Sequence, residues 1–386
     1  MLKRGVLLIG FLSTFSLSLA QHHEAAAETK PATETKVVSA EEAEKEQIKK
    51  ENKEFIDHHL LDAHSFDIMV EKKADGTEHH IGFPLPVIFY DEANGLHAFM
   101  SSEFHHGKEM KDAHGKKYNV VESKGANYAL YHEKIVKTDA SGAITLDDHG
   151  HVTNEKVLDL SITKSVLMIL CASLLMIVIF GSMARNYKKS PIPTGAGKLF
   201  EPLVIFIRDE IAIPNIGPKY HKYISYLLTI FFFILFLNVF GLLPFGINVT
   251  GNLAITAALA IFTFIITQFT ANRNYWQHIF WMPGLPFLMK LVMIPIELIG
   301  MIIKPFALLI RLFANMSAGH IVIFSLIAMI YYFQNVIAGV AFPFLTFVLY
   351  LLEILVAFLQ AYIFTMLSAV YFGMANEEHH HEEAHH

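Results

Sequence analysis

A single arginine, Arg311, lies inside a run that is otherwise apolar enough to cross a lipid bilayer, with residues 308–320 reading LLIRLFANMSAGH. Placing a guanidinium at mid-membrane costs about 2.5–3.5 kcal/mol on insertion scales, and a pKa above about 12 prevents its deprotonation. Such a cation needs an anionic partner or a water-filled cavity. Snorkelling to the interface is the alternative, but apolar residues extend far on both sides. The pattern favours an ion pathway.

The chain has two unlike parts. Of its 386 residues 53% are hydrophobic, but residues 21–164 are rich in Glu, Lys and His, whereas Leu, Ile, Phe, Val and Met dominate residues 165–374. The second part predicts an all-α polytopic membrane protein. The net charge of −6 comes mostly from the first part and the tail, so it gives no indication of nucleic-acid binding. The single cysteine, Cys171, excludes an intramolecular disulfide and a cysteine metal site.

Residues 1–20 combine two basic residues, an apolar core and small residues at the end, which predicts a signal peptide cut after Ala20. A retained membrane helix is the alternative, but the apolar core is short. Residues 21–56 are of low complexity and predict a disordered tether.

Residues 57–164 predict a small extracytoplasmic β-rich domain, because short β-prone runs alternate with turn signals. The runs are residues 66–70, 83–90 and 128–135, and the turn signals are Asp75-Gly76 and Asn94-Gly95. The many histidines of this part match no zinc template, so solvated surface histidines are favoured over a metal site.

Five apolar runs predict five membrane spans. They cover about residues 165–184, 224–243, 253–270, 286–332 and 342–374. At about 1.5 Å per residue the fourth run would extend roughly 70 Å, so it must tilt or kink, with Pro295 and Pro305 as candidate kinks. A charge-free turn is expected over residues 334–339, followed by the last, long span.

Seven Lys and Arg residues lie between the first and second runs, so the positive-inside rule places that loop in the cytoplasm. The N-terminus is then outside and the tail, residues 375–386, inside. Within the loop, residues 197–213 have apolar side chains at helical spacing among charged ones, which predicts an amphipathic helix on the membrane surface. A plain linker helix is the alternative.

Ionisable residues recur every seven positions along the fourth run, as Lys290, Glu297, Lys304 and Arg311. Seven residues turn a helix by about 700°, so each residue lies within roughly 20° of the previous one. The four therefore form one polar stripe, which Asn315 extends.

Helix geometry also predicts depth. His320 follows Arg311 by nine residues, about 13 Å, and Glu353 precedes Gln360 by seven, about 10 Å. If the last two helices are antiparallel neighbours, Gln360 lies near the depth of Arg311, and His320 and Glu353 share a more external level. Glu297 lies about 21 Å to the other side. This is the layout of two offset half-channels. Nine residues also turn His320 away from Arg311, and the alternative is that His320 is only a satisfied polar residue.

The segment RLFANMSAGH, with NVFGLLP and LQAYIFTMLSAVY, resembles subunit a of the F-type ATP synthase membrane sector, over residues 165–378. The resemblance implies that Arg311 faces a ring of rotor subunits, each carrying a membrane carboxylate. It also assigns roles to the other polar residues. These are Gln360 and Asn315 beside the arginine, His320 and Glu353 in the external channel with the family's two identities exchanged, and Glu297 near the cytoplasmic exit. Lys304 is a supporting residue only as a member of the polar stripe.

The resemblance implies a non-catalytic stator subunit of the proton channel, without cofactor or metal, in a bacterial inner membrane. Its implied partners are the ring of c subunits, the peripheral-stalk b subunits, the soluble catalytic head through that stalk, and the lipid bilayer. A proton-coupled secondary transporter is the alternative, but it would show an internal repeat of broken helices. A plain membrane anchor leaves Arg311 and Glu353 unexplained. Proton or sodium coupling stays open, although His320 favours protons.

Overall fold

The computed structural model describes residues 62–72, 78–112, 117–147, 152–190, 192–243, 248–281, 286–333 and 336–376. The predicted signal peptide, the tether and residues 377–386 of the tail lie outside the described residues, as does the expected turn at Asp75-Gly76.

Among the described residues, five helices are long and apolar enough to cross a membrane, as the five apolar runs predict. They are α4 (Lys164–Tyr187), α7 (Ile224–Leu242), α8 (Leu253–Thr270), α10 (Phe287–Phe333) and α11 (Val336–Asn376). Side-chain caps begin two of them. The Thr163 hydroxyl accepts from the backbone of α4, and the Asn252 side chain accepts from the backbone of α8. These contacts satisfy amides that have no partner within the helix.

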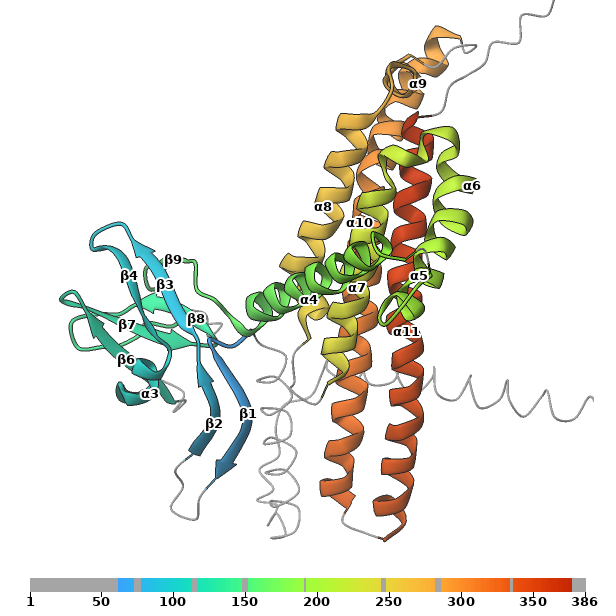
Figure 1. The fold of residues 1–386 in the computed structure, drawn as a ribbon. Helices are drawn as coiled ribbons and strands as arrows, with labels where there is room; N and C mark the ends of the chain where they lie inside the picture. The colour runs from blue at the N-terminus through green and yellow to red at the C-terminus, as the bar shows by residue number, and fades with distance from the viewer. Residues whose placement is uncertain are drawn as a thin grey trace, which may run out of the picture. The chain divides into compact units, whose positions relative to one another are not determined.

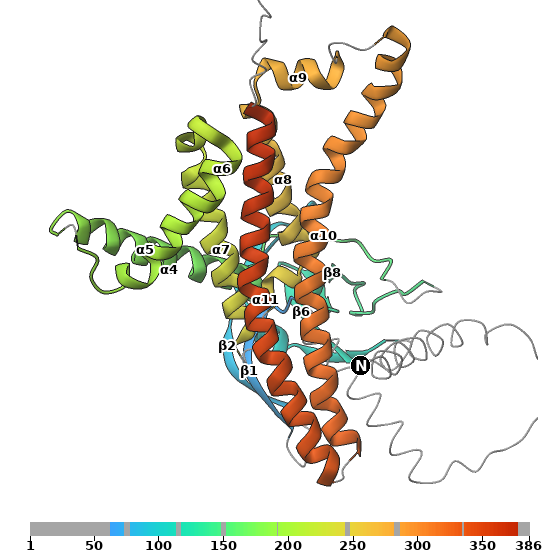
Figure 2. The same ribbon diagram turned by 90° about the vertical axis from the view of Figure 1, so that its right-hand side faces the viewer.

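The helices α10 and α11 form a long hairpin, and they lie side by side in both ribbon views (Figures 1 and 2). α11 already begins at Val336, so the described residues from Val336 to Gly339, which we expected in the turn, are helical. Pro295 and Pro305 both lie inside α10. Figure 2 shows α10 diverging from α11 towards the short helix α9 (Arg273–Phe280), which the sequence analysis did not predict.

The remaining helices brace this hairpin. α7 packs against α11, and α8 packs against α10. Gly373 of α11 allows the closest approach, because a Cβ there would lie 2.0 Å from the carbonyl oxygen of Asn215. Tyr223 stacks on Phe372 with ring centroids 4.6 Å apart. These contacts anchor the C-terminal end of α11.

The segment expected as one amphipathic helix is divided into three helical pieces. These are α5 (Gly197–Phe206), the π-helical turn η1 (Ile207–Ala212) and α6 (Ile213–Ile216), and a 3-10 helix, η2 (Gly217–Lys222), follows. Ile207 and Ile211 are fully buried, whereas Arg208 and Asp209 form an exposed ion pair. The segment therefore has the two-faced character that its sequence pattern indicates.

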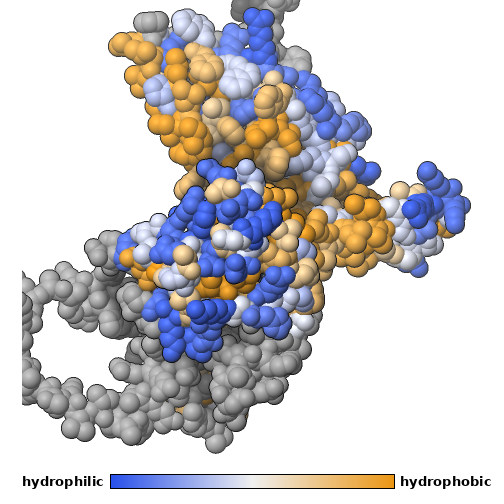
Figure 3. All heavy atoms as spheres, turned by 90° about the vertical axis from the view of Figure 1, so that its left-hand side faces the viewer, coloured by the Kyte–Doolittle hydropathy of each residue, from blue (hydrophilic) through white to orange (hydrophobic). Residues whose placement is uncertain are grey.

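The part before α4 is β-rich, and its strands are antiparallel. The strands are β1 (Ser65–Lys72), β2 (Glu78–Pro84), β3 (Pro86–Asp91), β4 (Gly95–Met100), β5 (Lys108–Lys111), β6 (Lys117–Ser123), β7 (Ala126–Tyr131), β8 (Lys134–Lys137) and β9 (Leu158–Asp159), and the short helix α3 (Ser102–His106) lies between β4 and β5. They form sheets of order β1-β2, β4-β3-β9 and β5-β6-β7-β8. In Figure 3 this region is mostly blue and white, whereas the helices are largely orange.

Two of the three expected strands are divided, since residues 83–90 cover the end of β2 and most of β3. Residues 128–135, which we expected to form one strand, contain a hairpin in which Tyr131 pairs with Lys134. His132 and Glu133 form its two-residue loop with φ of 48° and 57°. A loop with two positive φ values matches the right-handed twist of the strands. Because such loops usually contain Gly or Asn, His132 and Glu133 did not predict a turn.

A buried histidine ties the start of the β-rich region to its end. The Nε2 atom of His64 lies 2.9 Å from Asp159 Oδ2, and its Nδ1 lies 3.5 Å from Glu133 Oε2. Burial lowers the pKa of His64, but the hydrogen bonds to these two carboxylates outweigh it and raise the pKa to about 9. The ring is therefore an imidazolium at neutral pH.

Candidate functional site

Two polar pairs connect α10 and α11. The Asn315 amide donates to Gln360 Oε1 at 2.8 Å, and His320 Nδ1 lies 3.0 Å from Glu353 Oε1. The first pair lies closer to the start of α10 and to the end of α11, as antiparallel neighbours require. The structure thus brings four of the predicted site residues together in two pairs at different levels of the hairpin.

His320 is surrounded by acceptors. Besides Glu353, its Nδ1 lies 3.1 Å from the Met316 carbonyl and its Nε2 lies 3.0 Å from the Gly241 carbonyl of α7. A neutral imidazole has one N–H and can donate from only one of its two nitrogens. A doubly protonated ring can donate from both Nδ1 and Nε2. The residue is 7% exposed and Glu353 is 5% exposed, so little solvent screens them. This buried pair is able to hold and exchange a proton.

A glycine makes this contact possible. A Cβ on Gly319 would lie 2.7 Å from Glu353 Oε1 and 3.2 Å from its Cδ, closer than side chains tolerate. Only a glycine lets the carboxylate approach α10 in this way. The sequence analysis missed Gly319, although a glycine inside an apolar helix next to an ionisable residue is a signal for close packing.

A buried amide supports the same region from α7. The Asn238 side chain donates to the Ala357 carbonyl of α11 at 3.1 Å and accepts from the Thr250 hydroxyl at 2.9 Å. Such bonds are the usual means by which polar side chains hold membrane helices together. The sequence analysis did not assign Asn238 a role, although an amide inside an otherwise apolar span was a usable signal.

An open cavity of about 330 Å³ lies between α10 and α11 at this level. Its polar lining consists of Asn315, Glu353 and Gln360, and the remaining residues are apolar or small. Since one water occupies about 30 Å³, the cavity has room for several waters in contact with both polar pairs.

Arg311 lies on the exposed side of α10. Among the residues that the structure describes, no carboxylate forms an ion pair with it. Its neighbours on this side, Ala314 and Ala318, are small and exposed, whereas Leu312 and Met316 are buried. The helix therefore presents a fixed cation between small residues on its outer side, and His320 on its buried side.

Glu297 and Lys304 lie apart from these pairs, at the end where α10 and α11 diverge. They line a cavity of about 190 Å³ with Met301, with Met374 of α11 and with four residues of α9, namely Asn274, Tyr275, His278 and Ile279. The sequence analysis missed the contribution of α9 because an eight-residue helix has too few turns to show a clear period.

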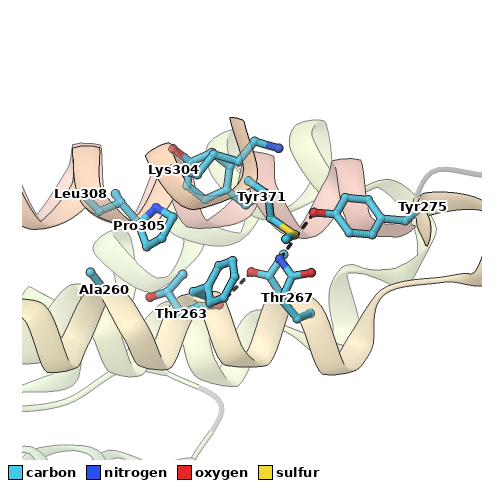
Figure 4. A pocket seen from close by; sticks show the side chains of 11 residues that line it. Ala260, Thr263, Thr267, Tyr275, Lys304, Pro305, Leu308 and Tyr371 are labelled. Carbon is cyan, nitrogen blue, oxygen red and sulfur yellow. Dashed lines mark hydrogen bonds between the residues drawn. The ribbon is translucent and has the colours of Figure 1, made fainter. Parts of the chain in front are cut away.

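Lys304 also reaches a second, narrow cavity of about 10 Å³, roughly the room that one water needs. Figure 4 shows side chains of four helices converging there, among them Thr263 and Thr267 of α8 and Tyr275 of α9. The ammonium of Lys304 lies 5.7 Å from the ring centroid of Tyr371, within cation–π range. Polar groups thus continue from the larger cavity towards the middle of α10.

In the described ranges, no group of three or more His, Cys, Asp and Glu side chains is arranged so that it could hold a metal ion.

These features define a multi-pass membrane protein with ionisable groups inside a pair of long helices. Comparison with known proteins specifies the family. The model of the family described as ATP synthase A chain matches residues 166–373, and the chain belongs to that family. It is therefore a proton-translocating subunit of the membrane sector of an ATP synthase. A second family, described as a domain of unknown function, matches residues 55–160.

Individual relatives agree. The chain is 48% identical over 227 residues to ATP synthase subunit a 2 of Chlorobaculum tepidum, covering 56% of this chain and 64% of that protein. It is 40% identical over 325 residues to ATP synthase subunit a of Chlorobium phaeobacteroides strain BS1, covering 79% and 93%. It is 45% identical over 236 residues to ATP synthase subunit a of Myxococcus xanthus, covering 59% and 77%.

Proposed function

We propose that this chain is the stator subunit that provides two offset half-channels, which load and unload protons on the carboxylates of a rotor ring of c subunits. His320 and Glu353 form the outer half-channel, Arg311 separates the two, and Glu297 and Lys304 line the inner one. The observation that carries the proposal is the exposed guanidinium of Arg311, without a carboxylate partner in the described part of the chain.

A rotor carboxylate would supply the missing partner. A permanent cation on the membrane surface of a helix is costly unless an anion approaches it. The exposed alanines beside Arg311 leave room for another helix to come close, as small residues do at membrane helix interfaces. Beside this position, the exposed Asn315 amide donates to Oε1 of the buried Gln360 at 2.8 Å.

The outer pair delivers protons. A proton taken up by Glu353 and His320 passes to a rotor carboxylate and neutralises it. The neutral carboxylic acid then faces lipid at far lower cost than the anion. After nearly a full turn of the ring, it meets the wet cavity beside Glu297 and ionises, since Arg311 favours the anion. Arg311 also repels protons that would cross directly, so transport requires rotation.

The seven Lys and Arg residues between α4 and α7 favour a cytoplasmic position for that loop by the positive-inside rule. The β-rich region is then periplasmic, after removal of a signal peptide, and the C-terminus is cytoplasmic in a bacterial inner membrane. Each proton that crosses 100 mV releases about 2.3 kcal/mol, so several are needed for each ATP. The catalytic head, joined through peripheral-stalk b subunits, makes the ATP, and this chain has no catalytic role.

The test is ATP-driven proton pumping in inverted vesicles with Arg311→Ala, after assembly of the complex has been shown. Ile302→Ala is the matched control, because Ile302 is 64% exposed on the same helix but nine residues away, on the opposite side. We expect the arginine variant to lose coupled pumping and to leak protons passively once the catalytic head is removed, while the control pumps normally. Normal coupled pumping by Arg311→Ala would refute the gate.

A further inference from the structure

The β-rich region exposes one apolar sheet face. Five large apolar side chains of the sheet β4-β3-β9 and its continuation are at least two-fifths exposed. They are Tyr90 (44%), Leu96 (55%), Met100 (42%), Leu158 (61%) and Leu160 (57%). Soluble domains seldom expose contiguous apolar surface of this kind without using it for contact with another surface.

Strand register makes the face contiguous. Tyr90 pairs with Leu96 on one side and with Leu158 on the other. β9 continues along β3, because the amide of Leu160 donates to Ile88 O at 2.8 Å and that of Ile162 to Pro86 O at 3.0 Å. Since side chains alternate between the faces of a strand, three apolar rows result. They are Leu158-Tyr90-Leu96, Leu160-Ile88-Ala98 and Ile162-Pro86-Met100.

The neighbouring sheet differs. One face of β5-β6-β7-β8 packs against Val87 and Phe89, the inward residues of β3. Its other face is covered by Ile144, Leu146 and Val152. The bare face is therefore a property of β4-β3-β9 and not of the whole region.

The bare face leads directly into the first membrane helix. Its third row ends at Ile162, and the next residue, Thr163, caps α4. The connection is fixed, because the Lys164 amide donates to Ala63 O at 3.0 Å and the Thr163 hydroxyl donates to Asp62 at 2.9 Å. The four residue steps of strand from Leu158 to Ile162 span only about 13 Å. The patch therefore lies within about that chain distance of the point where α4 enters the bilayer.

We propose that this face, consisting of Tyr90, Leu96, Met100, Leu158 and Leu160, rests on the lipid surface of the membrane that α4 enters. The exposed apolar residues at the start of α4, such as Val166 and Leu170, follow this face after only three polar residues, Thr163, Lys164 and Ser165.

The chemistry at the edge of the patch fits a lipid interface. Tyrosine is enriched at the level of lipid headgroups, and Tyr90 lies in the row farthest along the chain from α4. The ammonium of Lys124 contacts the Leu96 carbonyl, so a cation lies beside the apolar rows, where anionic headgroups attract it. The inference does not depend on which side of the membrane the region occupies, nor on the proposed half-channels.

Spin-label accessibility in the whole complex, reconstituted into liposomes, tests this. In a Cys171→Ser background, a nitroxide is attached at Leu96→Cys or, as the control, at Ser141→Cys, since Ser141 is exposed in a polar turn. Collisions with oxygen, which concentrates in lipid, are compared with collisions with a water-soluble nickel chelate. We expect the oxygen-to-nickel ratio at Leu96 to exceed that at Ser141 severalfold.

Two results overturn the proposal. Equal ratios at the two positions mean that the face lies in water. Low accessibility to both reagents at Leu96 means that a protein covers the face instead of lipid. An intact, pumping complex in all samples shows that neither result comes from misfolding.

Discussion

Adding one methyl group to Gly319 tests the outer half-channel without touching an ionisable residue. In Gly319→Ala the new Cβ would lie 2.7 Å from Glu353 Oε1. The carboxylate must withdraw by about 0.7 Å to reach ordinary van der Waals contact. Movement of that size away from α10 extends the 3.0 Å contact with His320 beyond hydrogen-bonding length.

The magnitude follows from the lost contact. A hydrogen bond that involves a charged group contributes about 1.5–3 kcal/mol, and each 1.4 kcal/mol corresponds to a factor of ten. If proton transfer through this pair limits pumping, the rate falls by about 10- to 100-fold. Folding should be spared, because the clash falls on the mobile end of a side chain and alanine favours a helix over glycine by about 1 kcal/mol.

ATP-driven proton pumping in inverted vesicles measures the effect, with assembly quantified in the same membranes. Gly300→Ala is the matched control, since it is a glycine of the same helix where a Cβ meets nothing within 4 Å. We expect normal pumping from this control. If Gly319→Ala pumps at the native rate in an assembled complex, the His320–Glu353 contact does not carry protons at a limiting step, and the reasoning is refuted.

Two further predictions concern stability. Gly373→Ala places a Cβ 2.0 Å from the Asn215 carbonyl, a backbone atom that cannot move aside cheaply. We expect a loss of at least about 1–3 kcal/mol, seen as a lower thermal midpoint of the complex, with Gly339→Ala unaffected; equal midpoints would contradict this. The pKa of His64 is about 9 in the folded chain and 6.5 in the unfolded chain. Its ion pairs therefore stabilise the β-rich region fully below pH 6.5 and progressively less up to pH 9. Hydrogen exchange of β9, corrected for intrinsic rates, should lose protection across that window in the native chain and not in His64→Gln, and pH-independent protection in the native chain would rule the reasoning out.

The helices of the membrane region could largely be predicted from the sequence. Apolar runs of span length predicted five helices, because a bilayer demands about 20 apolar residues for each crossing. The segment from Arg311 to His320 identified the family, which the comparisons support. The less periodic pieces were harder to predict, since the eight residues of α9 and the loop at His132-Glu133 carry no strong pattern.

Contacts between elements depended on tertiary structure. Helical periodicity orders residues around one helix, but it does not specify which neighbour each side of that helix meets. Packing against α7 and α11 buries His320 between the Gly241 carbonyl and Glu353, and leaves Arg311 exposed.

By itself, the sequence determined the class of protein, the number of apolar helices and the polar residues inside them, because hydrophobicity and helical spacing are local properties of the chain. Only the tertiary structure decided which of those residues meet, that Gly319 admits the Glu353 carboxylate, and that one sheet face before α4 stays bare. Those outcomes depend on contacts between residues far apart in the chain, and the geometry of packing sets them.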